Sequence, residues 1–351
     1  MTELYRSEIA EQPAVIAKIA GRFASEYGEA LAKARHGLLG NQFDRVIITG
    51  MGGSLHSTHA ALITLTRALT TPVLLWDAAE LTQQVPQLVN GRSAIIAVSQ
   101  SGESAELCRL TELADRPGLS ISLTNGADNA LANWADVAIT TAAGPESTAS
   151  TKTYTAGFAA LHLAVAHLIG QSEGSAEAVR GAADTIAGFL PALPRVAEEA
   201  AAFLGPVNAL VFVGRGASYA SAAMGALLTE EAAKLTCQPL TGGQFRHGPL
   251  ELVRSGFSAV IFAGEGEAAE LNFRLAQDTA GLGGRCIVIG DDLSRLARSE
   301  NLLPVTLPEV GGGLLPLTEI LPIQHLAIPL AIARGFEPAA FLNASKVTRL
   351  Q

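Results

Sequence analysis

The chain has 351 residues, of which 48% are hydrophobic and 16% charged, and its formal net charge is −9. This length allows two domains of ordinary size, and the apolar content excludes a disordered chain. There is no cluster of Lys and Arg, so nucleic acid is not an expected partner. No apolar run approaches the ~18 residues needed to cross a bilayer, and the first residues lack a signal-peptide core. We therefore expect a cytoplasmic protein without a membrane partner.

Short apolar runs rich in β-branched residues alternate along the chain with longer Ala- and Leu-rich stretches of helical period. Continuous apolar strands separated by helices are typical of a parallel α/β sheet with helices on both faces. The expected strands are 45–50, 71–76, 93–99, 119–124, 135–140, 208–214, 257–264, 284–290 and 302–308.

Two separated motifs show that the second half repeats the first. ITGMGGSLHS aligns with FVGRGASYAS when Gly50 meets Gly214, an offset of 214 − 50 = 164. SGESAEL aligns with EGEAAEL when Gly102 meets Gly266, which gives the same offset without a gap. We therefore predict two homologous flavodoxin-like three-layer sandwiches, each a parallel sheet flanked by helices.

The predicted organisation has four parts. Residues 1–40 form an N-terminal helical arm, 41–175 the first, phosphate-binding sandwich, and 195–335 the second sandwich. Residues 336–351 form a C-terminal tail, which the family resemblance given below implies reaches the active site.

The stretch AVSQSGES (97–104) places several hydrogen-bonding groups between an expected strand and an expected helix. Ligands of open parallel sheets bind beyond the carboxyl ends of the strands, and free N–H groups at a helix start favour anions. Gly102 allows a close backbone approach. The predicted phosphate donors are Ser54, Ser99, Gln100, Ser101 and Ser104. Helix capping alone would need only one of these serines.

The repeat provides an internal comparison for this site. In the second half Ala263, Glu265 and Ala268 replace the three serines of the loop, and a carboxylate would repel phosphate. We expect one phosphate site per chain. A dinucleotide site at TGMGG is a weaker alternative, because Leu55 stands where the third glycine of that fingerprint would be.

At these residues the sequence resembles the sugar isomerase (SIS) family with two SIS domains, and within it the isomerase half of glucosamine-6-phosphate synthases. The resemblance spans nearly the whole chain. It is carried by EIAEQP, MGGS, SQSGES, AGPESTASTKTYT, GRGASYASAAMGALLTEEAAKL, GGQFRHGPLEL and SKVT.

The resemblance implies roles for individual residues. Glu231 matches the glutamate that moves a proton between C1 and C2, and His247 matches the histidine that assists ring opening from the partner subunit of a homodimer. Lys346 matches the tail lysine that forms a Schiff base, although an ungapped alignment puts Ser345 there. Gly53, Ala149 and Ser150 are weaker candidates for substrate binding. Lys152 is expected to be structural.

Two departures from the family pattern affect these expectations. Leu228 occupies the place of an active-site lysine, so the polar surroundings of Glu231 should differ. The sequence also has no cysteine nucleophile after Met1 and no glutaminase segment, so we expect no ammonia from glutamine within this chain.

A carboxylate can move a proton between adjacent carbons, a histidine can protonate a ring oxygen, and a desolvated lysine can form an imine. The predicted function is therefore a phosphosugar isomerase or deaminase, most concretely one that converts glucosamine 6-phosphate to fructose 6-phosphate and ammonia. A fructosamine-phosphate deglycase and a simple aldose–ketose isomerase are alternatives. A non-catalytic sugar-phosphate sensor is an alternative of another class.

No metal or organic cofactor is predicted. Cys108, Cys237 and Cys286 lie far apart without metal-binding spacing and should be free thiols. His56 and His59 lie at i, i+3, but no carboxylate is near them in the sequence to complete a zinc site.

Overall fold

The computed structural model describes residues 1–311, 313–343 and 345–346. The chain forms two compact units, which are considered separately below. One unit contains residues 11–183 and 343–351, and the other contains residues 1–10 and 184–342. We call them the first and the second sandwich. The chain passes from one unit to the other after residues 10, 183 and 342, and the second of these boundaries falls inside the helix α9 (Ser175–Phe189).

The first sandwich is built on a five-stranded parallel sheet with the strand order β2-β1-β3-β4-β5. Its strands are β1 (Arg45–Gly50), β2 (Val73–Asp77), β3 (Ser93–Val98), β4 (Leu119–Thr124) and β5 (Val137–Thr140). Its helices are α2 (Gln12–Leu39), α3 (Gly52–His56), α4 (His59–Ala68), α5 (Ala78–Gln83), α6 (Ala105–Thr111), α7 (Ala130–Trp134) and α8 (Lys152–Leu168), with the 3-10 turn η1 (Pro86–Leu88).

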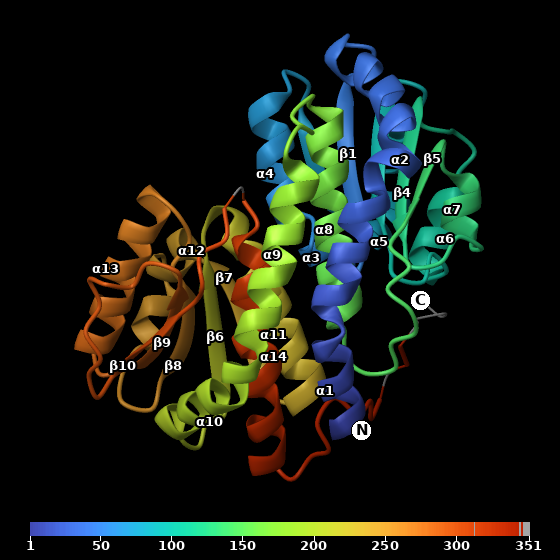
Figure 1. The fold of residues 1–351 in the computed structure, drawn as a ribbon. Helices are drawn as coiled ribbons and strands as arrows, with labels where there is room; N and C mark the ends of the chain where they lie inside the picture. Colours follow the sequence, from blue (N-terminus) through green and yellow to red (C-terminus); the bar gives the residue numbers. More distant parts are fainter. Residues whose placement is uncertain (312, 344, 347–351) are drawn as a thin grey trace. The chain divides into compact units, whose positions relative to one another are not determined.

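Helices cover both faces of this sheet. Apolar side chains of β1 and β3 pack against α5, α6 and α7 on one face, where Leu81, Leu107 and Leu131 are fully buried. On the other side α8 packs against α4 and the long helix α2. Figure 1 shows β4 and β5 between α6 and α7 on one side and α8 on the other. The arrangement confirms the predicted three-layer α/β sandwich.

The second sandwich repeats this topology with the strand order β10-β9-β8-β6-β7, again parallel. Its strands are β6 (Ala209–Gly214), β7 (Thr236–Thr241), β8 (Ser258–Phe262), β9 (Arg285–Gly290) and β10 (Leu302–Thr306). Its helices are α1 (Thr2–Ala10), α10 (Leu193–Leu204), α11 (Tyr219–Ala233), α12 (Gly242–Arg246), α13 (Glu267–Gly281) and α14 (Leu315–Ala333), with the turns η2 (Leu190–Ala192), η3 (Gly216–Ser218) and η4 (Pro249–Leu252).

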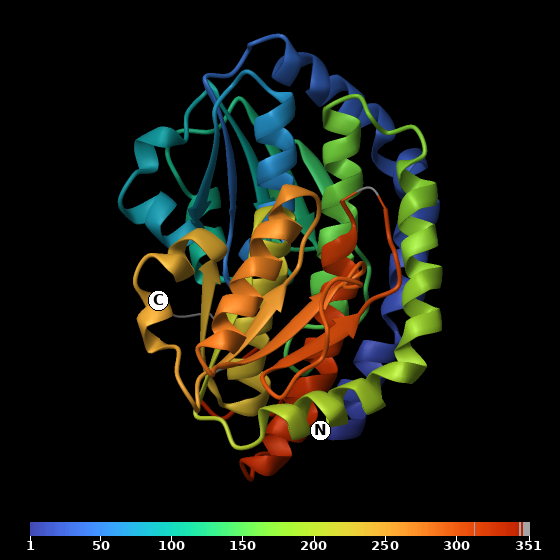
Figure 2. The same cartoon turned by 90° about the vertical axis from the view of Figure 1, so that its left-hand side faces the viewer.

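In this unit α12 and α13 cover one face of the sheet, while α11 packs against α14 on the other (Figure 1). Figure 2 views the unit with α13 (orange) in front of its sheet. The sequence did not predict β7, an edge strand that contains Pro239. Proline removes a donor from the ladder and is tolerated at a sheet edge, so the run TCQPLT lacks an ordinary strand pattern.

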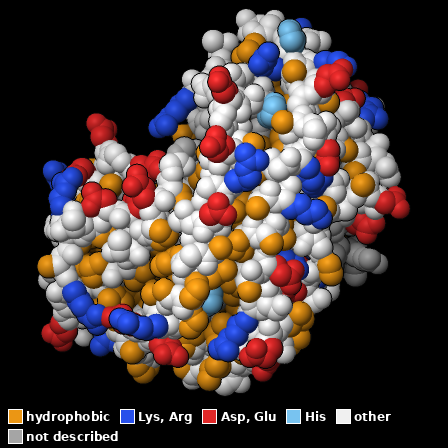
Figure 3. Space-filling view, in the orientation of Figure 1, with side chains coloured by type: hydrophobic (Ala, Val, Ile, Leu, Met, Phe, Trp, Pro, Cys, Tyr) orange, Lys and Arg blue, Asp and Glu red, His pale blue; other side chains and the backbone are white. Residues whose placement is uncertain are grey.

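The expectation that no apolar segment is long enough to cross a bilayer was wrong for helix α14. It has 19 residues and is apolar enough, by length and composition, to span one. However, 83% of its apolar window is buried inside the fold, which is the position of a core helix. On the face shown in Figure 3, Lys and Arg side chains are interspersed with Asp and Glu rather than gathered in one patch.

Candidate functional site

The loop that follows β3 is folded by its own serine side chains. Ser99 Oγ accepts a hydrogen bond from the Gly102 N–H at 3.0 Å, and Ser101 Oγ accepts one from the Glu103 N–H at 3.1 Å. Both oxygens thus act as acceptors toward the backbone. Their hydroxyl protons stay available to a ligand, because a hydroxyl both accepts and donates.

Gly102 is required at the centre of this loop. Its φ of +67° is in the left-handed region, and a Cβ atom there would lie 1.9 Å from Asn129 Oδ1. Asn129 caps α7, because its side chain accepts from the Ala132 N–H at 2.9 Å. The loop can therefore approach the start of α7 only with a glycine at this position.

Ser104 occupies the N-cap position of α6 without making a side-chain cap. Its Oγ is buried, and no hydrogen-bond partner for it exists among the described residues. A buried hydroxyl without a partner costs free energy. A phosphate oxygen would satisfy it. Because α6 has only seven residues, its dipole is short, and the hydroxyl and amide donors must provide most of the attraction.

A pocket lies at the carboxyl ends of β3 and β4, and Ser99 and Gln100 of this loop line it. Its volume, which includes space open to solvent, is ≈ 390 Å³. Of the predicted residues, the pocket brings together Gly53, Ser54, Ser99, Gln100 and Ser150. Ser101 and Ser104 belong to the same loop, and Ala149 is fully buried beside Ser150. Further lining residues that the sequence did not single out are Ser57, Thr124, Asn125, Thr141, Thr153 and Tyr154.

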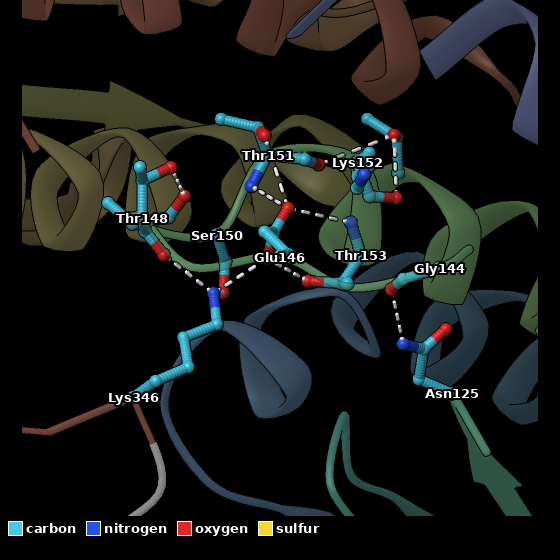
Figure 4. A network of polar contacts seen from close by, with 11 residues as sticks. Asn125, Gly144, Glu146, Thr148, Ser150, Thr151, Lys152, Thr153 and Lys346 are labelled. Carbon is cyan, nitrogen blue, oxygen red and sulfur yellow. Dashed lines mark hydrogen bonds and ion pairs between the residues drawn. The ribbon is translucent and has the colours of Figure 1, made fainter. Parts of the chain in front are cut away.

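A buried carboxylate organises the segment before α8, as Figure 4 shows. Glu146 accepts hydrogen bonds from the Thr151 N–H at 2.9 Å and the Thr153 N–H at 3.1 Å, and also from both threonine hydroxyls. Its side chain is fully buried. The chain from 146 to 153 is therefore wrapped around one carboxylate.

Lys346 is the cation that faces this carboxylate. Its Nζ lies 2.6 Å from Glu146 Oε2, 2.8 Å from the Thr148 carbonyl and 3.2 Å from Ser150 Oγ (Figure 4). Burial raises the pKa of Glu146, but Lys346 and the threonine donors outweigh it and hold that pKa below its ordinary value. Since Ser150 lines the pocket, the Lys346 amine stands at the pocket's edge.

The neighbouring tail and helix residues have different surroundings. Ser345 is exposed, and Val347 and Thr348 of the SKVT motif lie outside the described residues. Lys152, at the start of α8, has a side chain only 3% exposed and forms an ion pair with Glu11, as a structural residue would.

Glu231 and His247 belong to the second sandwich. Glu231 is half-buried near the end of α11, and His247 is exposed where α12 ends. Leu228 is fully buried in the core of this unit. Burial lowers the pKa of Lys234, and the charge of Glu231 opposes that shift, so the two groups interact electrostatically.

Glu146 is a further residue of this site that the sequence analysis did not single out. It lies within the AGPESTASTKTYT stretch, where it is the only acidic residue among hydroxyl, apolar and glycine positions apart from one lysine. That contrast was a usable signal. Its partner is 200 residues away, however, and the pairing is visible only in the fold.

Comparison with known proteins agrees with the fold and with the expected family. Residues 41–167 and 204–334 match the SIS domain model, so the chain belongs to the SIS-domain family. It is 31% identical over 351 residues to the glutamine–fructose-6-phosphate aminotransferase [isomerizing] of Pyrococcus horikoshii, covering 97% of this chain and 56% of that protein. The chain thus spans about half the length of the curated relatives it matches.

Solved structures share the fold of the whole chain. The C-terminal domain of a glucosamine-fructose-6-phosphate aminotransferase from Francisella tularensis superposes with a TM-score of 0.84 at 22% identity, covering 95% of this chain and 97% of that one. A glucosamine-6-phosphate deaminase from Thermotoga maritima gives 0.74 at 19% identity, covering 99% and 100%. A tagatose-6-phosphate ketose/aldose isomerase from Escherichia coli gives 0.80 at 19%, covering 97% and 96%.

Proposed function

We propose that this protein is a phosphosugar isomerase that holds its substrate's phosphate in the pocket of the first sandwich. The observation that carries the proposal is the buried, unpartnered Ser104 hydroxyl in a loop whose serines otherwise fold it. The proposed phosphate ligands are Ser54, Ser99, Gln100, Ser101 and Ser104. Gly53, Ala149 and Ser150 are proposed to contact the sugar.

Lys346 is the proposed Schiff-base residue, and the surroundings of its amine favour it over the exposed Ser345. An amine attacks a carbonyl only after losing a proton. Glu146 Oε2, at 2.6 Å, is near enough to accept that proton. We propose that Glu231 then moves the proton between C1 and C2, and that His247 protonates the ring oxygen during opening.

The most concrete form of the proposal is a deaminase: glucosamine 6-phosphate and water give fructose 6-phosphate and ammonia. One solved structure with this fold is a glucosamine-6-phosphate deaminase.

Two alternatives share the pocket and the fold. A deglycase of fructosamine phosphates would act on a substituted amine. A plain aldose–ketose isomerase would need no amine, and one solved structure with this fold is such an isomerase for tagatose 6-phosphate. A sugar-phosphate sensor without catalytic activity would not need Glu231, His247 or Lys346 as catalytic residues.

A cytoplasmic location stays a prediction.

The test is a substrate panel with matched variants. Glucosamine 6-phosphate, a fructosamine 6-phosphate and tagatose 6-phosphate are incubated with the wild type and with Glu231→Gln, and ammonia and ketose are measured. We expect ammonia from the wild type and at least ~100-fold less from the variant, as for loss of a general base. Glu230→Gln, one residue away and exposed, is the control and should keep activity. If the wild type turned over none of these sugar phosphates, the proposal that the protein is an enzyme would be refuted.

We also propose a homodimer in which His247 serves the partner's site. Mixing inactive Glu231→Gln and His247→Ala chains distinguishes this arrangement from a site built within one chain. If His247 acts across the interface, each hybrid dimer has one intact site, and random exchange restores about a quarter of the activity. If each site is built from one chain, the mixture stays inactive.

A further inference from the structure

The second sandwich carries a counterpart of the phosphate pocket in which the chain's own side chain is bound. At the offset of 164, Ser218 and Ser221 align with Ser54 and Ser57, which line the first pocket. Gly264 aligns with Gln100, and a Cβ atom at Gly264 would lie 3.5 Å from Ser218 Oγ. Ser218 therefore stands against the loop that corresponds to the phosphate loop.

The side chain held there is Glu319 of α14. Ser218 Oγ donates to Glu319 Oε1 at 2.7 Å, and Ser221 Oγ donates to Oε2 at 2.5 Å. All three residues are buried, with exposed fractions of 2% or less. Each carboxylate oxygen therefore has one serine hydroxyl from the segment that follows β6.

The group has no counter-ion: among the described residues, no Lys, Arg or His forms an ion pair with Glu319. Its electrostatic neighbours are Glu265 and Asp291, which are acidic. A buried carboxyl without a cation is costly and adds no stability by itself. Its retention in a mostly apolar helix is explained if it fills a site whose serine hydroxyls bind a carboxyl group.

We propose that Glu319 is a built-in ligand whose carboxyl group occupies, in the second sandwich, the position that corresponds to the phosphate pocket of the first. The correspondence rests on the proposed phosphate pocket. The site's ligand class is a small carboxylic acid, and Ser218 and Ser221 are its hydrogen-bond partners. Each chain then has one open pocket and one that is filled by its own Glu319 side chain.

Chemical rescue tests the proposal. Glu319→Ala removes a group about the size of acetate, so acetate is the probe. Thermal unfolding is followed at pH 5.5, where part of the added acetate is neutral acetic acid, with and without 50 mM total acetate, and with the same concentration of chloride as a control for ionic strength. We expect acetate to raise the Tm of Glu319→Ala by several degrees and to leave the wild type and Glu319→Gln unchanged, because their side chains still fill the site. In the triple variant with Ser218→Ala and Ser221→Ala, the response should disappear.

A response of Glu319→Ala no larger than that of Glu319→Gln would overturn the proposal. If Glu319→Ala does not fold, a double-mutant cycle between Ser218→Ala and Glu319→Gln replaces it. The proposal requires a coupling well above error, and strict additivity would contradict it. Both experiments measure effects on protein stability of residues that belong to the second sandwich alone. Failure of the proposed phosphate pocket would show separately, as absent sugar-phosphate binding by the wild type.

Discussion

The amine of Lys346 lies 2.6 Å from a carboxylate oxygen of Glu146, a fully buried side chain 200 residues earlier in the sequence. This ion pair ties the C-terminal tail to the first sandwich. It also places a nucleophilic amine beside a group that can take its proton. The same contact therefore contributes to stability and to the proposed chemistry.

Replacing Lys346 by methionine should destabilise the protein at neutral pH. Glu146 would remain ionised in a buried site without its cation, which typically costs about 3–5 kcal/mol. In the wild type the pKa of Glu146 is below its ordinary value, so its stabilising contribution is present above the unfolded-state pKa and is lost as pH falls through the folded-state pKa. In Lys346→Met that pKa should rise, and the deficit should shrink as pH falls. Urea unfolding at several pH values measures this.

Lys33→Met is the matched control, because Lys33 pairs with Glu29 on an exposed surface. Its effect should be much smaller, because solvent screens an exposed pair, and nearly independent of pH. The double variant Lys346→Met with Glu146→Gln should recover part of the loss. Equal deficits for both lysine variants would show that the tail pair contributes no more than a surface pair.

Ser104→Ala should separate binding from stability. The Ser104 hydroxyl is buried without a partner, so its removal should leave the free energy of unfolding unchanged or slightly higher. If that hydroxyl donates to the phosphate, sugar-phosphate affinity should fall about tenfold, the effect of one lost hydrogen bond. Isothermal titration with glucosamine 6-phosphate and thermal melts provide the two readouts.

Ser122→Ala is the control for this prediction. Ser122 lies in β4, and its hydroxyl is also buried without a partner among the described residues. Its removal should have the same small effect on stability and none on affinity. Unchanged affinity in Ser104→Ala would remove Ser104 from the proposed ligands.

Much of the first sandwich could be predicted because its signals are local. The serine loop after β3 is a contiguous stretch of sequence, and the strands and helices alternate along the chain. The repeat relates the two halves of the chain by a single offset. Glu265 in place of Ser101 led to the expectation of one phosphate site per chain, which stays a prediction. The contact of Glu319 with Ser218 and Ser221 was not predictable, because Glu319 comes from a helix about 100 residues further along the chain.

Gly102→Ala should distort the whole serine loop after β3 rather than remove a single contact. A Cβ atom would lie 1.9 Å from Asn129 Oδ1, and the φ of +67° disfavours any side chain. Left-handed strain costs about 1 kcal/mol, and displacement of Asn129 weakens the cap of α7 by about another 1 kcal/mol. We expect about 2 kcal/mol lost in urea unfolding, with reduced phosphate affinity. Gly126→Ala, where nothing lies within 4 Å, is the control and should cost less than half of this.

The two buried glutamates should respond to pH in opposite directions. Glu146 has a cation and four donors, whereas Glu319 faces two serine hydroxyls and the acidic Glu265 and Asp291. Burial, together with the two acidic neighbours, raises the pKa of Glu319 to about 7, and the serine hydrogen bonds oppose this shift. A raised folded-state pKa means that stability is complete below the unfolded-state pKa and is lost as pH rises.

Glu319→Gln should therefore remove the free-energy cost of ionising the buried Glu319 carboxyl group as pH rises. Between about pH 5.5 and pH 8.5 the wild type should lose about 2 kcal/mol that the variant keeps, because the buried carboxyl must ionise near pH 7. The variant should then be the more stable protein at pH 8.5, while the two converge toward pH 5. Urea unfolding of both proteins across this range measures the difference, and Glu267→Gln, an exposed glutamate at the start of α13, corrects for general charge effects. Parallel stability curves for the wild type and Glu319→Gln would mean that Glu319 is ionised throughout, stabilised by its serines despite the missing cation.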